Sequence, residues 1–71
     1  MELSDLQNRF THHPPRDHEQ ADKYAEIRRA GYAMAFEVNN LAPDSREKSL
    51  AITRIEEAVM WANAAIARNE Q

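Results

Sequence analysis

The sequence predicts an all-α protein, in which a short N-terminal helix precedes a long antiparallel helical hairpin that assembles as a homo-oligomer. Apolar residues recur at helical spacing in three segments, and a proline-centred break divides the last two. Charged residues make up 30% of the chain and hydrophobic residues 42%, a balance that suits helices with apolar stripes rather than disorder. Because 71 residues cannot build two cores, residues 1–71 are expected to form one helical-hairpin domain.

The N-terminal segment is expected to be a short helix followed by a loop. Its apolar positions at helical spacing are Leu3, Leu6 and Phe10, which predict about two helical turns over residues 1–10. A helix of this length is not stable on its own. Residues 11–19 contain Pro14 and Pro15, and adjacent prolines do not fit inside a helix, so an ordered loop or an extended arm is expected there.

Two long helices are predicted over residues 19–41 and 45–69. The first carries an apolar seam that steps by three and four residues, at Tyr24, Ile27, Gly31, Met34, Val38 and Leu41. The second carries a similar seam at Ile52, Ile55, Val59, Ala62 and Ile66. Pro43 ends the first helix, and Asp44 with Glu47 forms a capping box that begins the second. The short connection makes the two helices antiparallel neighbours.

The predicted hairpin has more apolar surface than two helices can bury against each other. The positions outside the two seams are Tyr32, Phe36, Leu50, Ala51, Ala58, Met60, Trp61 and Ala65. Ordering the chain costs about 1.5 kcal/mol per residue, which a hairpin of this size struggles to offset. Other copies of the chain are therefore expected to cover this surface. The alternative is a three-helix monomer, in which the helix over residues 1–10 covers Trp61.

The composition excludes several classes of protein. Without cysteine the chain has no disulfide and no thiolate site, and a single glycine rules out a glycine-rich phosphate loop. No apolar run is long enough to span a membrane and the N-terminus does not resemble a signal peptide, so a cytosolic location is expected. A net charge of -3 argues against binding of duplex nucleic acid, although a few local cations suffice for a small anionic ligand.

The sequence offers only weak candidates for metal binding and catalysis. His12, His13 and His18 lie close together, but no carboxylate stands at a diagnostic helical spacing from them, so solvated or stacking imidazoles are expected. Adjacent Glu56 and Glu57 point about 100° apart on a helix and do not form a paired-carboxylate site. A chain this small also has little interior in which to tune a general base. No catalytic residue, metal or cofactor is expected.

The cations that follow Pro43 are more informative. Arg46 and Lys48 lie in the first turn of the second long helix, where the helix dipole disfavours positive charge. Together with the hydroxyls of Ser45 and Ser49 and the free helix amides, Arg46 is placed to receive a phosphate. In the alternative arrangement, Arg46 and Lys48 pair with Asp44 or with acidic groups of a neighbouring copy. The residues alone favour neither arrangement.

Four blocks of the sequence resemble one known family. They are residues 10–15 (FTHHPP), 24–28 (YAEIR), 43–51 (PDSREKSLA) and 56–69 (EEAVMWANAAIARN). In these blocks the chain resembles the phage anti-CBASS cyclic-nucleotide sponges, whose helical-hairpin domain is shared with a phage anti-Thoeris protein. The resemblance extends over about residues 9–70, and its last block is long and unusual in composition.

The resemblance implies a function that composition and spacing do not. Such proteins are helical homo-oligomers, typically hexamers, which bind cyclic di- or trinucleotides made by bacterial immune synthases and do not cleave them. Sequestration in the host bacterial cytosol keeps the downstream effector inactive. The resemblance therefore implies a non-enzymatic phage protein, whose partners are a cyclic oligonucleotide and further copies of itself.

The resemblance also implies which residues bind the ligand. Those implied for a dinucleotide pocket are His12, His13, Pro14 and Arg28, with the arm against a base and the arginine on a phosphate. Those implied for a second pocket, which resembles a trinucleotide site near the oligomer axis, are Ser45, Arg46, Ser49 and Thr53. His12 stands where tyrosine is usual in the family, which implies weaker or pH-sensitive stacking.

A helical protein-interaction module is the alternative function. In that case the stripe formed by Ala51, Ala58, Trp61 and Ala65 docks a helix of a host protein. A chain that is monomeric in isolation leaves this stripe free, whereas a closed oligomer covers it. Light scattering of the purified protein distinguishes the two.

Overall fold

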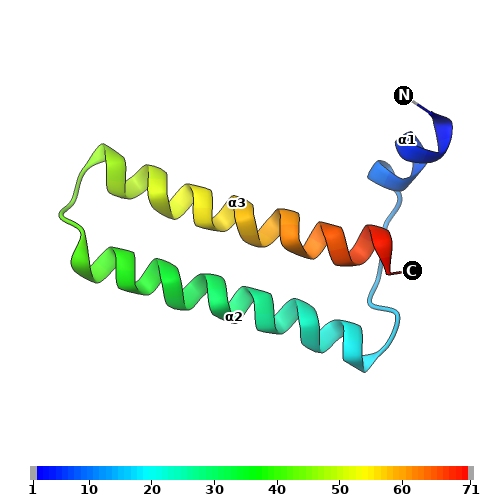
Figure 1. Ribbon diagram of the computed structural model, residues 1–71, viewed down its shortest axis with the longest axis horizontal. Coiled ribbons are helices and arrows are strands. Elements are labelled where there is room, and N and C mark those ends of the chain that lie inside the picture. Colours follow the sequence, from blue (N-terminus) through cyan, green and yellow to red (C-terminus); the bar gives the residue numbers. More distant parts are fainter. Residues whose placement is uncertain (1, 71) are drawn as a thin grey trace.

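The computed structural model describes residues 2–70, which form three helices in the order α1 (Leu3–Phe10), α2 (His18–Leu41) and α3 (Arg46–Asn69). Helices α2 and α3 lie side by side and run in opposite directions (Figure 1), which confirms the predicted all-α hairpin. The described part of the chain contains no strand. The short α1 lies beyond the open end of the hairpin, near the end of α3 (Figure 1).

Side-chain caps determine where the two long helices begin. The Asp17 carboxylate accepts a hydrogen bond from the Gln20 amide at 2.9 Å and caps α2. The Ser45 hydroxyl accepts a hydrogen bond from the Lys48 amide at 3.1 Å and caps α3. The prediction that Asp44 caps this helix is wrong. The Asp44 carboxylate lies one residue earlier and instead forms an ion pair with Lys48 Nζ at 2.9 Å.

Acid is expected to weaken the starts of both long helices. The hydrogen bond from the Gln20 backbone amide holds the pKa of Asp17 below its ordinary value, and the hydrogen bond and charge of Lys48 lower the pKa of Asp44. Each pKa is lower in the folded chain than in the unfolded chain. The stabilisation is therefore complete above about pH 4 and is lost as the pH falls through the folded values. Circular dichroism during an acid titration measures the loss of helix.

The Asp17→Asn variant is the control for this titration. Asparagine is as good a helix cap as aspartate but does not ionise, so the variant is expected to lose less helix in acid than the wild type. Identical acid titrations of the two proteins would contradict the role of Asp17.

The contact between α2 and α3 follows the period of a straight helix. The buried and partly buried residues of α2 are Gln20, Ala21, Tyr24, Ile27, Gly31, Ala35 and Val38. The predicted seam is wrong at Met34 and Leu41, which are 59% and 81% exposed. That seam has the 3.5-residue period of a coiled coil, whereas a straight helix drifts by about 20° per heptad, which turns Met34 outward and Ala35 inward. On α3 the predicted seam is confirmed, since all five of its residues are partly buried.

Gly31 allows the two helices to approach each other closely near the middle of the hairpin. A Cβ atom added at this position would overlap the Val59 Cγ2 methyl group and would lie 3.9 Å from Ile55 Cγ2. Valine is branched at Cβ and its side chain is therefore restricted in a helix, so this methyl group cannot easily rotate away. The packing of α2 against Val59 of α3 thus depends on the absence of a side chain at residue 31.

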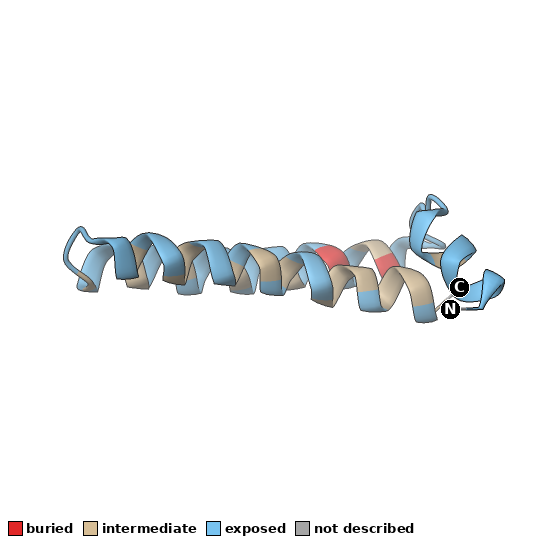
Figure 2. Cartoon of the chain, turned by 90° about the horizontal axis from the view of Figure 1, so that it is seen from above, coloured by how far each residue is buried: buried red, intermediate tan, exposed pale blue. Residues whose placement is uncertain are grey.

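The hairpin is about one helix thick and buries very little. Its extents are 44 × 31 × 13 Å and its radius of gyration is 15.1 Å, whereas a compact domain of this length has about 11 Å. Among residues 2–70 only Gln20 and Tyr24 are buried, and Figure 2 shows an otherwise exposed or partly buried ribbon. The accessible surface is 5752 Å², about 1200 Å² more than the ~4500 Å² typical of a folded monomer of this mass.

Helix α1 does not complete a three-helix core. Its apolar residues Leu3, Leu6 and Phe10 are exposed, and Trp61 on α3 is 66% exposed. The Asn8 side chain ties α1 to the hairpin, since Nδ2 donates to the Arg68 carbonyl at 3.4 Å. The apolar surface that was expected to need a partner therefore stays open in a single chain.

Candidate nucleotide-binding surfaces

The ion pairs formed within residues 2–70 do not involve Arg28 or Arg46. Five cations are paired, as Arg16–Asp17, Lys23–Glu70, Arg29–Glu26, Lys48–Asp44 and Arg54–Glu57. Arg28 and Arg46 are exposed and have no ion pair or side-chain hydrogen bond within residues 2–70. Arg9 and Arg68 also lack an ion pair there, but Arg68 lies over the Trp61 ring at 6.0 Å. A free guanidinium can hold a phosphate through two parallel hydrogen bonds.

Arg28 lies at the edge of an apolar groove between α2 and α3. The side chains around it include Arg28, Tyr32 and Ala35 of α2, and Ile55, Glu56 and Met60 of α3. Tyr32 follows Arg28 by one helical turn, is 71% exposed and has its ring centroid 6.2 Å from that of Phe36. The groove therefore combines a cation for a phosphate with a flat ring and an apolar floor for a base.

Sequence reasoning did not include Tyr32 among the binding residues. It placed Tyr32 with the apolar positions left over from the seam. The signal that identifies it is its spacing of four residues from Arg28, which brings both side chains onto one face of the helix.

The arm that contains His12, His13 and Pro14 lies away from this groove. His13 is partly buried, with Nε2 3.0 Å from the Asn8 carbonyl oxygen, while His12 and Pro14 are exposed. No residue of the arm lines the groove around Arg28. The arm is attached near Gln20, and Arg28 lies about 12 Å further along α2 at a rise of about 1.5 Å per residue. The structure of one chain therefore does not bring the arm and Arg28 together.

The turn between the long helices places its two cations in different environments. Lys48 forms the ion pair with Asp44 that one of the two arrangements requires, and its side chain is largely buried. Arg46 does not join this pair and stays free of ion pairs within residues 2–70. The Ser45 hydroxyl caps α3 and also donates to the Pro43 carbonyl at 3.0 Å, so its hydrogen-bonding capacity is already used within the turn.

Ser49 and Thr53 extend the exposed polar surface beyond Arg46. They follow Ser45 at intervals of four residues, so all three hydroxyls lie along one side of α3. Both side chains are exposed, and neither has a side-chain hydrogen bond within residues 2–70. This side of the helix offers one cation and two free hydroxyls to a ligand.

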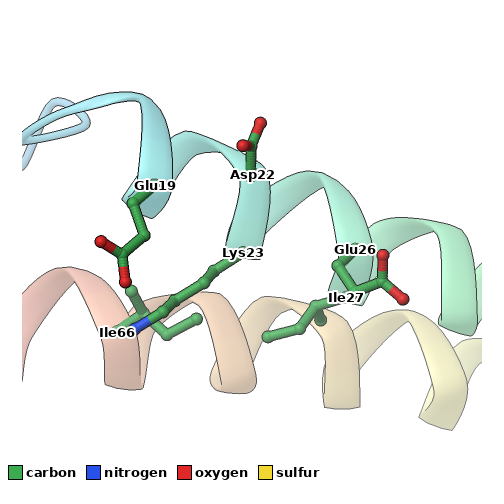
Figure 3. Close-up of a pocket in the computed structure, with 6 residues that line it drawn as sticks. All are labelled: Glu19, Asp22, Lys23, Glu26, Ile27 and Ile66. Carbon is green, nitrogen blue, oxygen red and sulfur yellow. The ribbon is translucent and has the colours of Figure 1, made fainter.

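A third surface, shown in Figure 3, does not suit an anion. It is lined by Glu19, Asp22, Lys23, Glu26, Ile27 and Ile66. The Lys23 side chain extends across Ile66 toward α3, whereas Asp22 points away from the groove (Figure 3). Lys23 Nζ lies 3.1 Å from a Glu70 carboxylate oxygen, so its charge is already balanced. The remaining charges of this surface are carboxylates.

Neither a metal site nor a membrane span is found in the part of the chain that the structure describes. Among residues 2–70, no three His, Asp or Glu side chains are placed to hold a metal ion. The helices in that range also lack the length and apolar character needed to cross a bilayer.

Comparison with known families matches the model of the Acb2/Tad1 hairpin domain to residues 2–67. The chain belongs to the Acb2/Tad1 hairpin family. This confirms the resemblance to the anti-CBASS and anti-Thoeris sponges that was drawn from the sequence blocks. No curated protein and no solved structure matches the chain.

The Acb2/Tad1 match covers every candidate binding residue, from His12 to Thr53. It ends at residue 67, before the last turn of α3. Two residues that contact the N-terminal segment, Arg68 and Glu70, therefore lie outside the matched range of the Acb2/Tad1 hairpin.

Proposed function

We propose that this chain is a phage protein that binds cyclic di- or trinucleotides and sequesters them without cleavage, in the cytosol of the infected bacterium. Removal of the messenger would keep CBASS-type antiphage signalling inactive. The observation that carries the proposal is the family match over residues 2–67. Arg28 and Arg46 support it, because both are exposed, neither has an ion pair within residues 2–70, and each phosphate of a cyclic nucleotide is an anion that a guanidinium binds well.

The dinucleotide site is proposed at the groove around Arg28. Arg28 binds a phosphate, Tyr32 provides a flat surface for a base, and the arm with His12, His13 and Pro14 closes over the ligand. Because the arm lies about 12 Å from Arg28 along its own α2, the arm that reaches this groove belongs to a neighbouring copy. The second site is proposed at the face of α3 that carries Arg46, with the free hydroxyls of Ser49 and Thr53. Ser45 joins it only when its hydroxyl hydrogen leaves the Pro43 carbonyl.

Assembly into a homo-oligomer, proposed to be a hexamer, is part of this function. A single chain exposes about 1200 Å² more surface than a globular monomer of its mass, and a stable interface buries about 800 Å² on each partner. Large apolar side chains outside the groove around Arg28 stand exposed on both long helices, among them Phe36, Leu50 and Trp61. Copies that pack through these residues bury the surface that a lone hairpin leaves open.

Capture without turnover is the expected result when the purified protein is mixed with cyclic di-AMP, cyclic di-GMP, cyclic GMP–AMP and cyclic tri-AMP. At least one of these rings should be retained with the protein on a filter. It should be recovered intact after the protein is denatured by heat, as measured by mass spectrometry. Linear products would indicate an enzyme, and complete passage of all four rings through the filter at about micromolar protein would contradict the proposed function.

The exposed Trp61 stripe keeps the protein-interaction module as a second candidate function. Trp61 is 66% exposed, and Arg68 lies over its ring. If this stripe docks a host helix, the isolated chain is a monomer, whereas the sponge is a closed assembly. Light scattering that reports a mass close to 8.2 kDa would favour the module.

A further inference from the structure

The N-terminal segment is tied to the open end of the hairpin by a small group of hydrogen bonds. The Gln20 side chain accepts a hydrogen bond from the Arg16 backbone amide at 2.7 Å. Arg16 Nη1 donates to the Glu70 carbonyl at 2.6 Å, and Asn8 donates to the Arg68 carbonyl. Carbonyls in the last turn of a helix have no partner within it, so these donors bind groups that α3 leaves unsatisfied.

Gln20 is at the centre of this group. It occupies the third position of α2, where its own amide binds the Asp17 carboxylate and its side chain reaches back to Arg16. The arrangement resembles a capping box, except that the side chain binds the residue before the cap. Gln20 therefore contacts both the residue that caps α2 and the residue that precedes this cap.

The burial of Gln20 is unfavourable unless its polar side chain has a specific role. Gln20 is 0% exposed, and its Nε2 group finds no hydrogen-bond partner among residues 2–70. A buried donor without a partner costs about 1–3 kcal/mol, so an apolar side chain of the same size would suit the interior better. The polar atom of the Gln20 side chain that has a partner is Oε1, which accepts the hydrogen bond from the Arg16 amide at the base of the arm.

We propose that Gln20 is a positioning residue, which fixes the base of the arm so that His12, His13 and Pro14 are ordered before the ligand arrives. The inference rests on the proposed function, because the arm is assigned to the ligand there. Pro14 and Pro15 stiffen the chain just before Arg16, and the His13 ring contacts the Asn8 carbonyl at the other end. Holding Arg16 therefore restricts the whole arm, and an arm ordered in advance loses less entropy on binding.

The test compares Gln20→Met with Gln20→Glu in the full-length chain. Methionine keeps the volume but removes the acceptor, whereas glutamate keeps an acceptor for the Arg16 amide. The hydrogen-exchange rate of the Arg16 backbone amide, measured without ligand, reports how firmly the base of the arm is held. Calorimetry measures the affinity for whichever of cyclic di-AMP, cyclic di-GMP and cyclic GMP–AMP the wild type retains on the filter. Gln20→Met is expected to exchange about tenfold faster at Arg16 and to bind several-fold more weakly. Gln20→Glu buries a carboxylate and is expected to lose overall stability, but to keep the slow exchange at Arg16 because its side chain still accepts from that amide.

The Arg16→Ala variant is the matched control. It removes the guanidinium contact with Glu70 but keeps the backbone amide that Gln20 binds, so the exchange at residue 16 should stay slow. Unchanged exchange in Gln20→Met would overturn the proposal, as would faster exchange with undiminished affinity. If Gln20→Met fails to fold, Gln20→Leu at lower temperature replaces it. If the wild type binds no ring, the proposed function fails, and the exchange at Arg16 alone decides whether Gln20 holds the arm.

Discussion

Replacing Arg28 with alanine is expected to weaken the capture of a cyclic dinucleotide about thirty-fold, with helix content and assembly unchanged. A hydrogen bond between an arginine and a phosphate contributes about 2 kcal/mol, which corresponds to that factor in the dissociation constant. Arg28 is exposed and has no ion pair within residues 2–70, so its removal leaves no carboxylate without a partner. Isothermal titration calorimetry measures the affinity.

The neighbouring arginine provides the control for this variant. Arg29→Ala removes the same charge from the next position of α2, but Arg29 is engaged with Glu26. The affinity of Arg29→Ala is expected to stay close to that of the wild type. Equal losses in the two variants would indicate an effect of net charge only. Dissociation of the assembly by Arg28→Ala, detected by light scattering, would mean that Arg28 has a structural role and that the proposed site is wrong.

The largest expected effect on stability comes from Gly31→Ala. The added Cβ overlaps the Val59 methyl group, and overpacking of this kind costs about 1–3 kcal/mol. The loss is expected to outweigh the better helix propensity of alanine, about 1 kcal/mol, because the restricted Val59 side chain cannot easily move away from the added Cβ. Urea unfolding followed by circular dichroism, at a fixed protein concentration, measures the free energy of unfolding.

A second background distinguishes steric overlap from other causes. In a Val59→Ala chain the methyl group that Gly31 accommodates is absent, so Gly31→Ala is expected to stabilise the protein there by up to about 1 kcal/mol. The sign of the effect should therefore reverse between the two backgrounds. A destabilisation of the same size in both would rule out the contact with Val59 as its origin.

The fold could be predicted because its determinants are local. Pro43 ends one helix whatever lies around it, and the α3 seam is correct where branched aliphatic residues occupy four of its five positions. The errors occur where neighbouring residues compete for one role. Asp44 and Ser45 are both good caps, and only the folded turn decides that Ser45 binds the helix amide while Asp44 pairs with Lys48. Met34 was assigned to the seam because of an assumed 3.5-residue period.

The candidate site could be predicted only in part. Arg28 was implied by family resemblance, and Arg46 also by its place in the first turn of the second long helix, but which cations remain free depends on side-chain pairing such as that of Arg29 with Glu26. Gln20 gave no signal, because a buried glutamine looks like any polar residue of an exposed helix face in one sequence. The sequence also did not reveal the distance between the arm and Arg28 in the folded chain. Spacing along a sequence does not show which copy of a protein supplies each part of a shared site.

Among residues 2–70 only Gln20 and Tyr24 are buried, so in the proposed assembly the folding of each chain would depend on the presence of its neighbours. When association supplies most of the core, the fraction of folded chain rises steeply with the amount synthesised, by mass action. At low concentrations of the protein, the infected cell would contain unassembled, largely unfolded chains that bind little ligand and are readily degraded by proteases. At higher concentrations, binding capacity would develop abruptly, so the timing and strength of expression would decide when signalling is silenced.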